Sequence, residues 1–130
     1  MSRKSKSTWA FLKNRRNKVN KIYMGVNTGP GPQDVVVFYT DGSKRTHPLH
    51  HIVRHSLDGF QWGYGGSGPA DLALSILCDC LSVPMAHKYY QAFKFKFVAS
   101  ADRQLYIKEA DILDWIGEQE NKEKQNEEGA

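Results

Sequence analysis

A loop rich in glycine is the first candidate for chemistry in this chain. Residues 59–69 read Gly-Phe-Gln-Trp-Gly-Tyr-Gly-Gly-Ser-Gly-Pro and hold five of the eleven glycines. Glycine reaches backbone conformations that other residues avoid, at an entropic cost on folding, so this density indicates a loop whose shape is required. An apolar segment with helical spacing follows directly, and backbone N–H groups at a helix N-terminus attract anions. We therefore predict a ligand-binding loop made of Trp62, Gly63, Tyr64, Gly65, Gly66, Ser67 and Gly68.

The same loop has a second interpretation, in which the glycines only form a turn that packs Trp62 and Tyr64 against the helix. The loop lacks the Lys-Ser/Thr ending of a P-loop, and no Gly-x-Gly-x-x-Gly follows a convincing strand. Asp71 is expected in the first helical turn, where the helix dipole favours its carboxylate but where that charge would repel a phosphate. Both interpretations stay open on sequence alone.

A catalytic group can also be drawn from these residues. His55 could act as acid or base beside Asp58 or Asp71, with Ser67 as a nucleophile. Ser67 lies in Gly-Gly-Ser-Gly-Pro, which differs from the Gly-x-Ser-x-Gly nucleophile elbow because Pro69 replaces the last glycine. A hydrolase or transferase is therefore kept as an alternative. The leading prediction is a protein without catalytic residues and without a cofactor.

Histidine is concentrated just before the loop. Four of the five histidines, His47, His50, His51 and His55, lie within nine residues, which is the density of a metal site. No cysteine or carboxylate stands at a matching spacing, and Pro48 prevents His47 and His51 from sharing a helical face. We predict a polar edge strand with surface histidines and no bound metal.

The positive charge of the chain belongs to its N-terminal arm. Residues 1–21 contain eight basic residues and no acid, residues 22–117 have a net charge of −1, and residues 118–130 have a net charge of −3. Cations that neutralise phosphates release counterions, and the aromatic side chains of Trp9 and Phe11 can stack on bases. The predicted nucleic-acid contacts are Arg3, Lys4, Lys6, Lys13, Arg15, Arg16 and Lys18.

Cysteine content and hydropathy bear on the compartment. The only cysteines, Cys78 and Cys80, point to different sides of a predicted helix and cannot pair with each other, so a reducing compartment fits. The longest apolar run falls short of the roughly 20 residues of a membrane span. We expect a cytoplasmic protein with no membrane partner.

These residues need a scaffold, and the hydrophobic pattern predicts one. Strands are expected at residues 21–26, 34–40 and 44–49, the second central and the third at an edge, with a turn at Asp41-Gly42. A buried helix is expected from Pro69 to about Leu81 and a second from Ser82 to Gln91. Alternation at residues 93–97 predicts a strand with exposed Lys94 and Lys96, paired with residues 104–107.

Helices are further expected at residues 8–19 and 110–119. The fold class is then α+β, with antiparallel strands around a buried central helix. It forms a single small domain over residues 22–117, between a basic arm (1–21) and a flexible acidic tail (118–130).

Two segments together resemble a known family. Gly-Phe-Gln-Trp-Gly-Tyr-Gly-Gly-Ser-Gly-Pro, followed by Ala-Asp-Leu-Ala-Leu and later by Tyr90, Gln91, Phe93 and Lys94, is similar to a family of small uncharacterised proteins from phages, plasmids and other mobile elements. The resemblance covers residues 22–117 and implies a mobile-element origin without an activity. The arm and the acidic end lie outside it.

Binding is therefore expected rather than catalysis. The leading hypothesis is a small phage or mobile-element accessory protein that binds nucleic acid or a nucleotide through the arm and the glycine loop. One version of this hypothesis is a protein that counteracts a host defence system. The alternative is an inhibitor that binds a host defence or replication protein through Phe60, Trp62 and Tyr64. The second alternative is the small hydrolase or transferase built on His55, Ser67 and Asp71.

Overall fold

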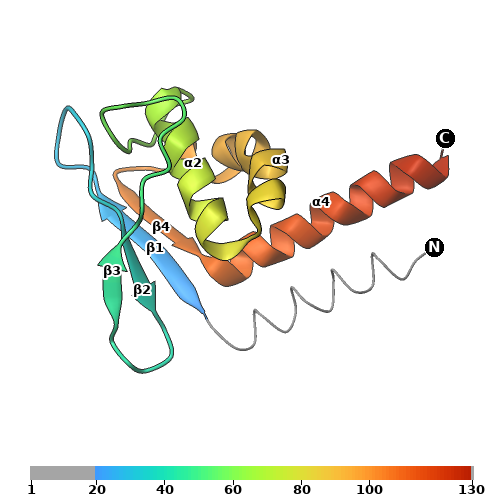
Figure 1. The fold of residues 1–130 in the computed structure, drawn as a ribbon, viewed down its shortest axis with the longest axis horizontal. Coiled ribbons are helices and arrows are strands. Elements are labelled where there is room, and N and C mark those ends of the chain that lie inside the picture. The colour runs from blue at the N-terminus through green and yellow to red at the C-terminus, as the bar shows by residue number, and fades with distance from the viewer. Residues whose placement is uncertain (1–19, 130) are drawn as a thin grey trace.

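The computed structural model of the chain describes residues 20–129. Its elements are β1 (Lys21–Val26), β2 (Val36–Tyr39), β3 (Thr46–Pro48), α2 (Ser67–Cys80), α3 (Val83–Phe93), the π-helix η1 (Lys94–Val98), β4 (Gln104–Lys108) and α4 (Glu109–Gly129). The strands form one antiparallel sheet in the order β3-β2-β1-β4, and the helices pack over one side of it (Figure 1). The predicted α+β fold is confirmed. None of the helices within residues 20–129 combines the length and the hydropathy needed to cross a membrane.

The sheet separates an inner from an outer face by simple alternation. Tyr23 of β1 is paired with Val37 of β2 on one side and with Ile107 of β4 on the other, and all three are at most 5% exposed beneath the helices. The predicted positions of the strands within the sheet are also confirmed, since β2 is internal and β3 is an edge strand. Pro48 ends β3, where its missing N–H costs no ladder bond.

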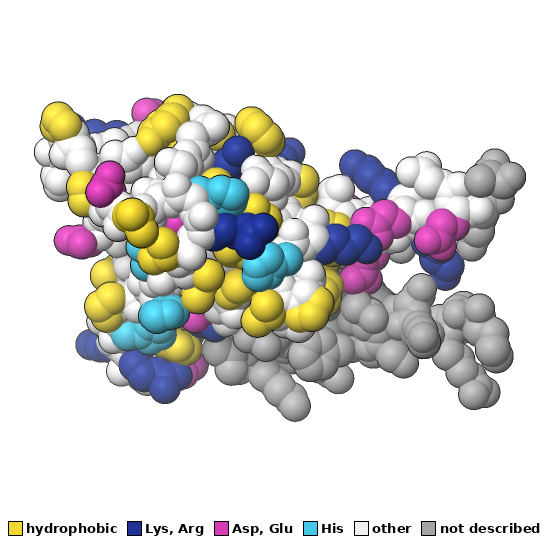
Figure 2. Space-filling model, turned by 45° about the horizontal axis from the view of Figure 1, so that its top comes forward, with side chains coloured by type: hydrophobic (Ala, Val, Ile, Leu, Met, Phe, Trp, Pro, Cys, Tyr) yellow, Lys and Arg dark blue, Asp and Glu magenta, His cyan; other side chains and the backbone are white. Residues whose placement is uncertain are grey.

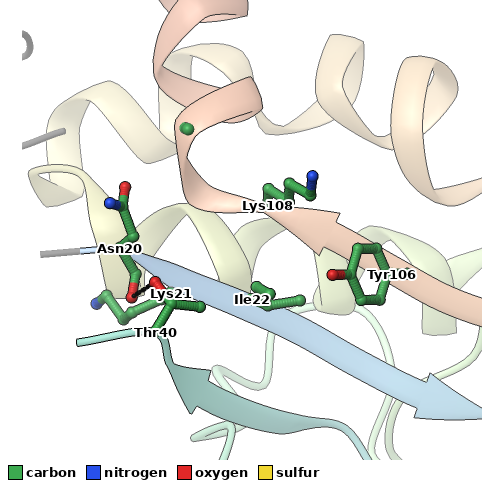
Figure 3. A pocket seen from close by; sticks show the side chains of 7 residues that line it. Asn20, Lys21, Ile22, Thr40, Tyr106 and Lys108 are labelled. Atoms are coloured by element: carbon green, nitrogen blue, oxygen red, sulfur yellow. Dashed lines mark hydrogen bonds between the residues drawn. The ribbon is translucent and has the colours of Figure 1, made fainter. Parts of the chain in front are cut away.

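The outer face of the sheet carries a mixed surface. Tyr106 is half exposed, and an open hollow of about 520 Å³ lies beside it (Figure 3). Thr40 donates its hydroxyl to the carbonyl of Asn20 at 3.1 Å at the rim of this hollow. The lining consists of Asn20, Lys21, Ile22, Thr40, Tyr106, Lys108 and Ala110.

The central helix α2 forms the core, as its nearly uniform apolar sequence predicts. Leu72, Leu74, Ile76 and Leu77 are fully buried. Trp62 extends from the preceding loop to the sheet, where Gly25 of β1 makes room for it. A Cβ atom at Gly25 would lie 2.8 Å from Cη2 of Trp62 and 2.7 Å from the carbonyl oxygen of Asp34, so no other residue fits there without a shift of the backbone.

The expected strand at residues 93–97 is wrong. Phe93 ends α3, and Lys94–Val98 form a π-turn in which the Ala99 N–H donates to the Lys94 carbonyl at 2.7 Å. This wide turn stacks the rings of Phe93 and Phe97, whose centroids lie 4.8 Å apart, and both rings contact Trp115. A helical arrangement therefore buries Phe93 fully and Phe97 partly, and the alternating pattern alone could not distinguish this from a strand.

Consequently β4 has a different partner from the predicted one. It returns antiparallel beside β1, with Met24 opposite Tyr106. Because the helices lie between β3 and β4 in sequence, this pairing is long-range, and local patterns carry little information about it.

The last helix is longer than expected. It begins at Glu109, buries Ile112, Trp115 and Ile116 as predicted, and continues to Gly129 through the segment expected to be a flexible tail. Glu123 holds this extension to α3, accepting from Lys88 Nζ at 2.8 Å and from the Tyr89 hydroxyl at 3.2 Å. Both charged side chains are about half exposed, so the ion pair adds little stability. The expected helix at residues 8–19 lies outside the described residues.

Candidate functional site

The glycine loop is anchored to the body of the protein rather than lying free on it. Gly63 adopts a φ of 89°, a conformation that favours glycine, and its N–H donates to the Val98 carbonyl at 3.0 Å. Trp62 is only 3% exposed, and its indole N–H donates to the carbonyl of Asp102 at 2.9 Å. Phe60 is also buried, so the predicted exposed patch of Phe60, Trp62 and Tyr64 keeps only Tyr64 at the surface.

The loop leads into the N-terminus of α2, but the helix begins earlier than predicted. Ser67 is its first residue, and Gly66 is the N-cap with no side-chain capping bond. The first turn contains no acid, because Asp71 lies one turn further along. The expectation that Asp71 occupies the first turn is therefore wrong.

Two aromatic rings are exposed on the loop and next to it. Tyr64 is 49% exposed and Phe95 of η1 is 63% exposed. A Cβ atom at Gly65 would lie 3.2 Å from Phe95 Cε1, and one at Gly66 would lie 2.4 Å from Tyr64 Cε2, so both glycines allow the rings to approach the backbone. The Tyr64 hydroxyl donates to Gln61. Sequence analysis missed Phe95 because it was assigned to a strand.

Lys94 brings a cation to the same place. Its side chain is not on an exposed sheet face, as predicted, but is 7% exposed, with Nζ 4.3 Å from the centroid of the Phe95 ring. Within residues 20–129 it makes no ion pair with a carboxylate. The side chain is thus mostly buried while its ammonium still reaches solvent beside the Phe95 ring, where it is available to an anion. Lys96, two residues on, is exposed.

A second hollow lies on the other side of the loop. It has a volume of about 570 Å³ and is lined by Trp62, Gly63, residues 27–29 and residues 101–103. Among the described residues that line it, Arg103 is the one cation, and Asp102 beside it offsets that charge. This hollow therefore has less attraction for an anion than the surface around Lys94.

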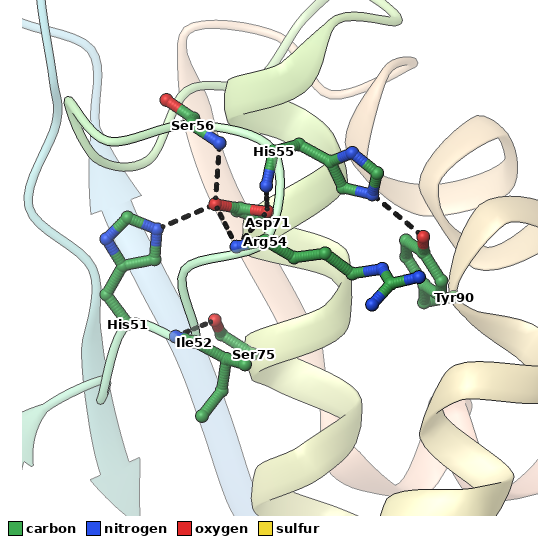
Figure 4. Close-up of polar contacts among 8 residues, drawn as sticks. All are labelled: His51, Ile52, Arg54, His55, Ser56, Asp71, Ser75 and Tyr90. Atoms are coloured by element: carbon green, nitrogen blue, oxygen red, sulfur yellow. Dashed lines mark hydrogen bonds and ion pairs between the residues drawn. The ribbon is translucent and has the colours of Figure 1, made fainter.

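Asp71 organises the segment that precedes the loop (Figure 4). Its carboxylate is fully buried and accepts His51 Nε2–H at 3.0 Å and the backbone N–H groups of Arg54, His55 and Ser56 at 2.8–3.3 Å. Burial alone would raise the pKa of Asp71, but these hydrogen bonds outweigh it and leave the pKa below its ordinary value. Asp71 is thus a structural anchor that fixes the chain across α2.

The predicted catalytic group of His55, Ser67 and Asp71 does not assemble. Only the backbone of His55 contacts Asp71, while its ring is 2.8 Å from the hydroxyl of Tyr90. The imidazole that pairs with Asp71 is His51, and Ser67 is exposed at the start of α2.

Three of the four clustered histidines likewise contact different partners. His47 contacts the Tyr39 hydroxyl at 2.9 Å, while His51 and His55 are held as above. In the part of the chain that the structure describes, no three histidine, cysteine or carboxylate side chains are placed to hold a metal ion.

A buried polar cluster was not foreseen. Lys21, assigned to the arm by charge, is 7% exposed and donates to Asp79 Oδ2 at 2.8 Å, where the Tyr23 hydroxyl also donates at 2.7 Å. Burial, followed by the charges of its neighbours, raises the pKa of Tyr23. Burial is also the main reason that the pKa of Cys80 rises to about 12, so this thiol is not a nucleophile at neutral pH. The cluster ties β1 to α2 and is structural.

Fold and site together define a small α+β domain that presents an aromatic and cationic surface beside a glycine loop. The chain belongs to the family of unknown function DUF6166, whose model matches residues 23–118. The match includes the glycine loop and Lys94, and it excludes the arm. No curated protein and no solved structure matches the chain significantly.

Proposed function

We propose that the protein is a non-enzymatic binder of single-stranded nucleic acid. The observation that carries the proposal is the grouping of two exposed rings, Tyr64 and Phe95, with the ammonium of Lys94, which has no carboxylate partner within the described residues. We name these three residues the loop surface. Hydrophobic and basic side chains lie side by side over the upper part of the molecule in Figure 2.

The chemistry of the loop surface suits an unpaired strand. Every base offers a π-face, and stacking on an aromatic side chain contributes about 1–3 kcal/mol per base. A phosphate between two stacked bases would neutralise Lys94, which the protein leaves uncompensated. Stacking requires bases that are already splayed apart, which is why the proposal specifies a single strand.

The basic arm supplies affinity without sequence preference in this proposal. Residues 1–19 have a net charge of +7, whereas residues 20–129 have a net charge of −3. Association with a polyanion would therefore depend on the arm, with the loop surface fixing where the strand lies. The role proposed is that of a mobile-element accessory protein acting in the cytoplasm of its host.

The test uses fluorescence anisotropy of a labelled single-stranded oligonucleotide. The double variant Tyr64→Leu/Phe95→Leu should weaken binding about tenfold or more, since two stacking contacts are lost. Tyr106→Leu is the matched control, because Tyr106 is 51% exposed on β4 and outside the loop surface. Equal affinities of the double variant and the control would contradict the proposal.

A second candidate function rests on other exposed side chains. Leu57 is 90% exposed and Val53 is 53% exposed in the segment before the loop, close in sequence to Tyr64. Exposed apolar and aromatic side chains of this kind supply hot spots in protein interfaces. An inhibitor of a host protein would lose its partner on Leu57→Ser, while oligonucleotide binding would stay unchanged, so one variant separates the two functions.

A further inference from the structure

One arginine and two histidines are grouped near Tyr90 of α3, in and beside the segment that Asp71 anchors. His55 stacks on Tyr90 with ring centroids 5.9 Å apart, and His87 meets the same ring edge-on at 6.2 Å. In Figure 4 the side chain of Arg54, the residue before His55, points in the direction of Tyr90. Figure 2 shows basic and histidine side chains in a band across the middle of the molecule.

The backbone beneath these side chains is fixed. Three consecutive N–H groups, from Arg54 to Ser56, donate to the buried carboxylate of Asp71. The neighbouring Ile52 N–H donates to Ser75 Oγ at 2.8 Å, so the segment is held to α2 at two points. Arg54 and His55 are therefore presented from a pre-formed backbone, which lowers the entropic cost of binding.

The hydrogen-bonding capacity of the group is only partly used. His55 Nε2 pairs with the Tyr90 hydroxyl at 2.8 Å, and His87 Nδ1 pairs with the Val83 carbonyl at 3.1 Å. Within the described part of the chain, His55 Nδ1, His87 Nε2 and the Arg54 guanidinium make no hydrogen bond or ion pair. The Arg54 guanidinium therefore has free donors, and His55 Nδ1 and His87 Nε2 are free ring nitrogens. Because His87 Nδ1–H donates to the Val83 carbonyl, His87 Nε2 donates only when the ring is protonated.

The nearby acids do not neutralise this group. Asp71 lies below the backbone, is fully buried and already accepts four hydrogen-bonding groups. Glu123 is engaged by Lys88 and Tyr89. A guanidinium matches a tetrahedral oxyanion because Arg donates to two oxygens at once, and a neighbouring imidazole adds one donor when its free ring nitrogen carries a proton.

We propose that Arg54, His55, His87 and Tyr90 form a binding site for a phosphate group. The site is separate from the loop surface. A phosphate monoester and the phosphodiester of a nucleic-acid strand share this chemistry, and the experiment distinguishes them. The proposal goes beyond the proposed function, since it holds for a small phosphate compound even if no nucleic acid binds.

The experiment follows the imidazole signals of the full chain by NMR during titration with inorganic phosphate. Saturable shifts of the His55 and His87 signals, with the signal of His47 unmoved, are expected. Arg54→Gln should raise the phosphate Kd about tenfold or more, because a bidentate charged contact is lost. Arg45→Gln is the matched control, since Arg45 stacks on Tyr39 at 3.9 Å, outside the proposed site.

Equal shifts of all histidine signals, the absence of saturation, or equal effects of the two arginine variants would overturn the proposal. The variant Tyr64→Leu/Phe95→Leu should keep the phosphate Kd of the wild type, so failure of the loop surface is distinguished from failure of this site. Repeating the titration with a nucleoside monophosphate and with a short oligonucleotide identifies the source of the phosphate. Tighter binding of the monophosphate than of the oligonucleotide assigns the site to a small ligand, and the reverse order assigns it to a strand.

Discussion

At the scale of single residues, the buried carboxylate of Asp71 fixes the path of the segment that precedes the glycine loop. It accepts hydrogen bonds from His51 and from three consecutive backbone N–H groups, so both oxygens are occupied. Sequence analysis selected Asp71 and His55 but as catalytic partners. Asp71 stands out in the sequence because a carboxylate in an apolar helix is rare. Its pairing with His51 could not be predicted, because it depends on how the segment before the loop crosses α2.

The variant Asp71→Asn tests this anchoring role. An amide has the same shape but one oxygen, and its NH₂ group would face donors, so the free energy of unfolding should fall by about 2–4 kcal/mol at pH 7. The pKa of Asp71 is depressed in the folded state, so its stabilisation is complete above the ordinary value of 3.8 and is lost as the pH falls through the lower folded value. Urea unfolding at pH 7 and at pH 3 should show the difference between wild type and variant shrinking at pH 3. A difference that is independent of pH would contradict the assignment.

At the scale of helices and strands, the elements around the glycine loop were predicted only in part. The loop and α2 were foreseen from Gly63, Pro69 and the apolar run, because glycine and proline act locally. The π-turn η1 was not, since Phe93, Phe95 and Phe97 alternate with lysines as in a strand. The π-turn is favoured by a tertiary contact, the packing of Phe93 and Phe97 on Trp115 of α4. The residues next to η1 in sequence do not encode this contact.

The two aromatic residues of the loop should respond differently to truncation. Trp62→Ala removes a buried ring over Gly25 and should lower the free energy of unfolding by about 3–5 kcal/mol. Tyr64→Ala removes a half-exposed ring and should cost about 1 kcal/mol or less. Thermal and urea melts of both variants measure this. Similar losses for the two would mean that Tyr64 is part of the core and not of a recognition surface.

Charge is unevenly distributed at the scale of the whole molecule. Net positive charge is confined to residues 1–19, while α4 extends an acidic end away from the body (Figure 1). This asymmetry was evident from composition, because charge can be counted without a fold. Within residues 20–129, composition misassigned Lys21, whose ammonium pairs with Asp79 inside the domain.

If the cations of the arm contact phosphates, the affinity for nucleic acid must fall as the salt concentration rises, and removing arm cations must weaken that dependence. For single strands the slope of log K against log salt concentration is about 0.7 per neutralised phosphate. The triple variant Arg15→Gln/Arg16→Gln/Lys18→Gln should therefore reduce the magnitude of that slope by about 2, because three phosphate contacts would be lost. Lys122→Gln/Lys124→Gln on α4 is the matched control, with cations removed from the acidic end and little change expected in the slope. Anisotropy titrations over a range of salt concentrations, with the melting temperature measured for each variant, give the result. An unchanged slope in the triple variant would exclude these three cations as contacts and would leave the other arm cations and the loop surface to account for binding.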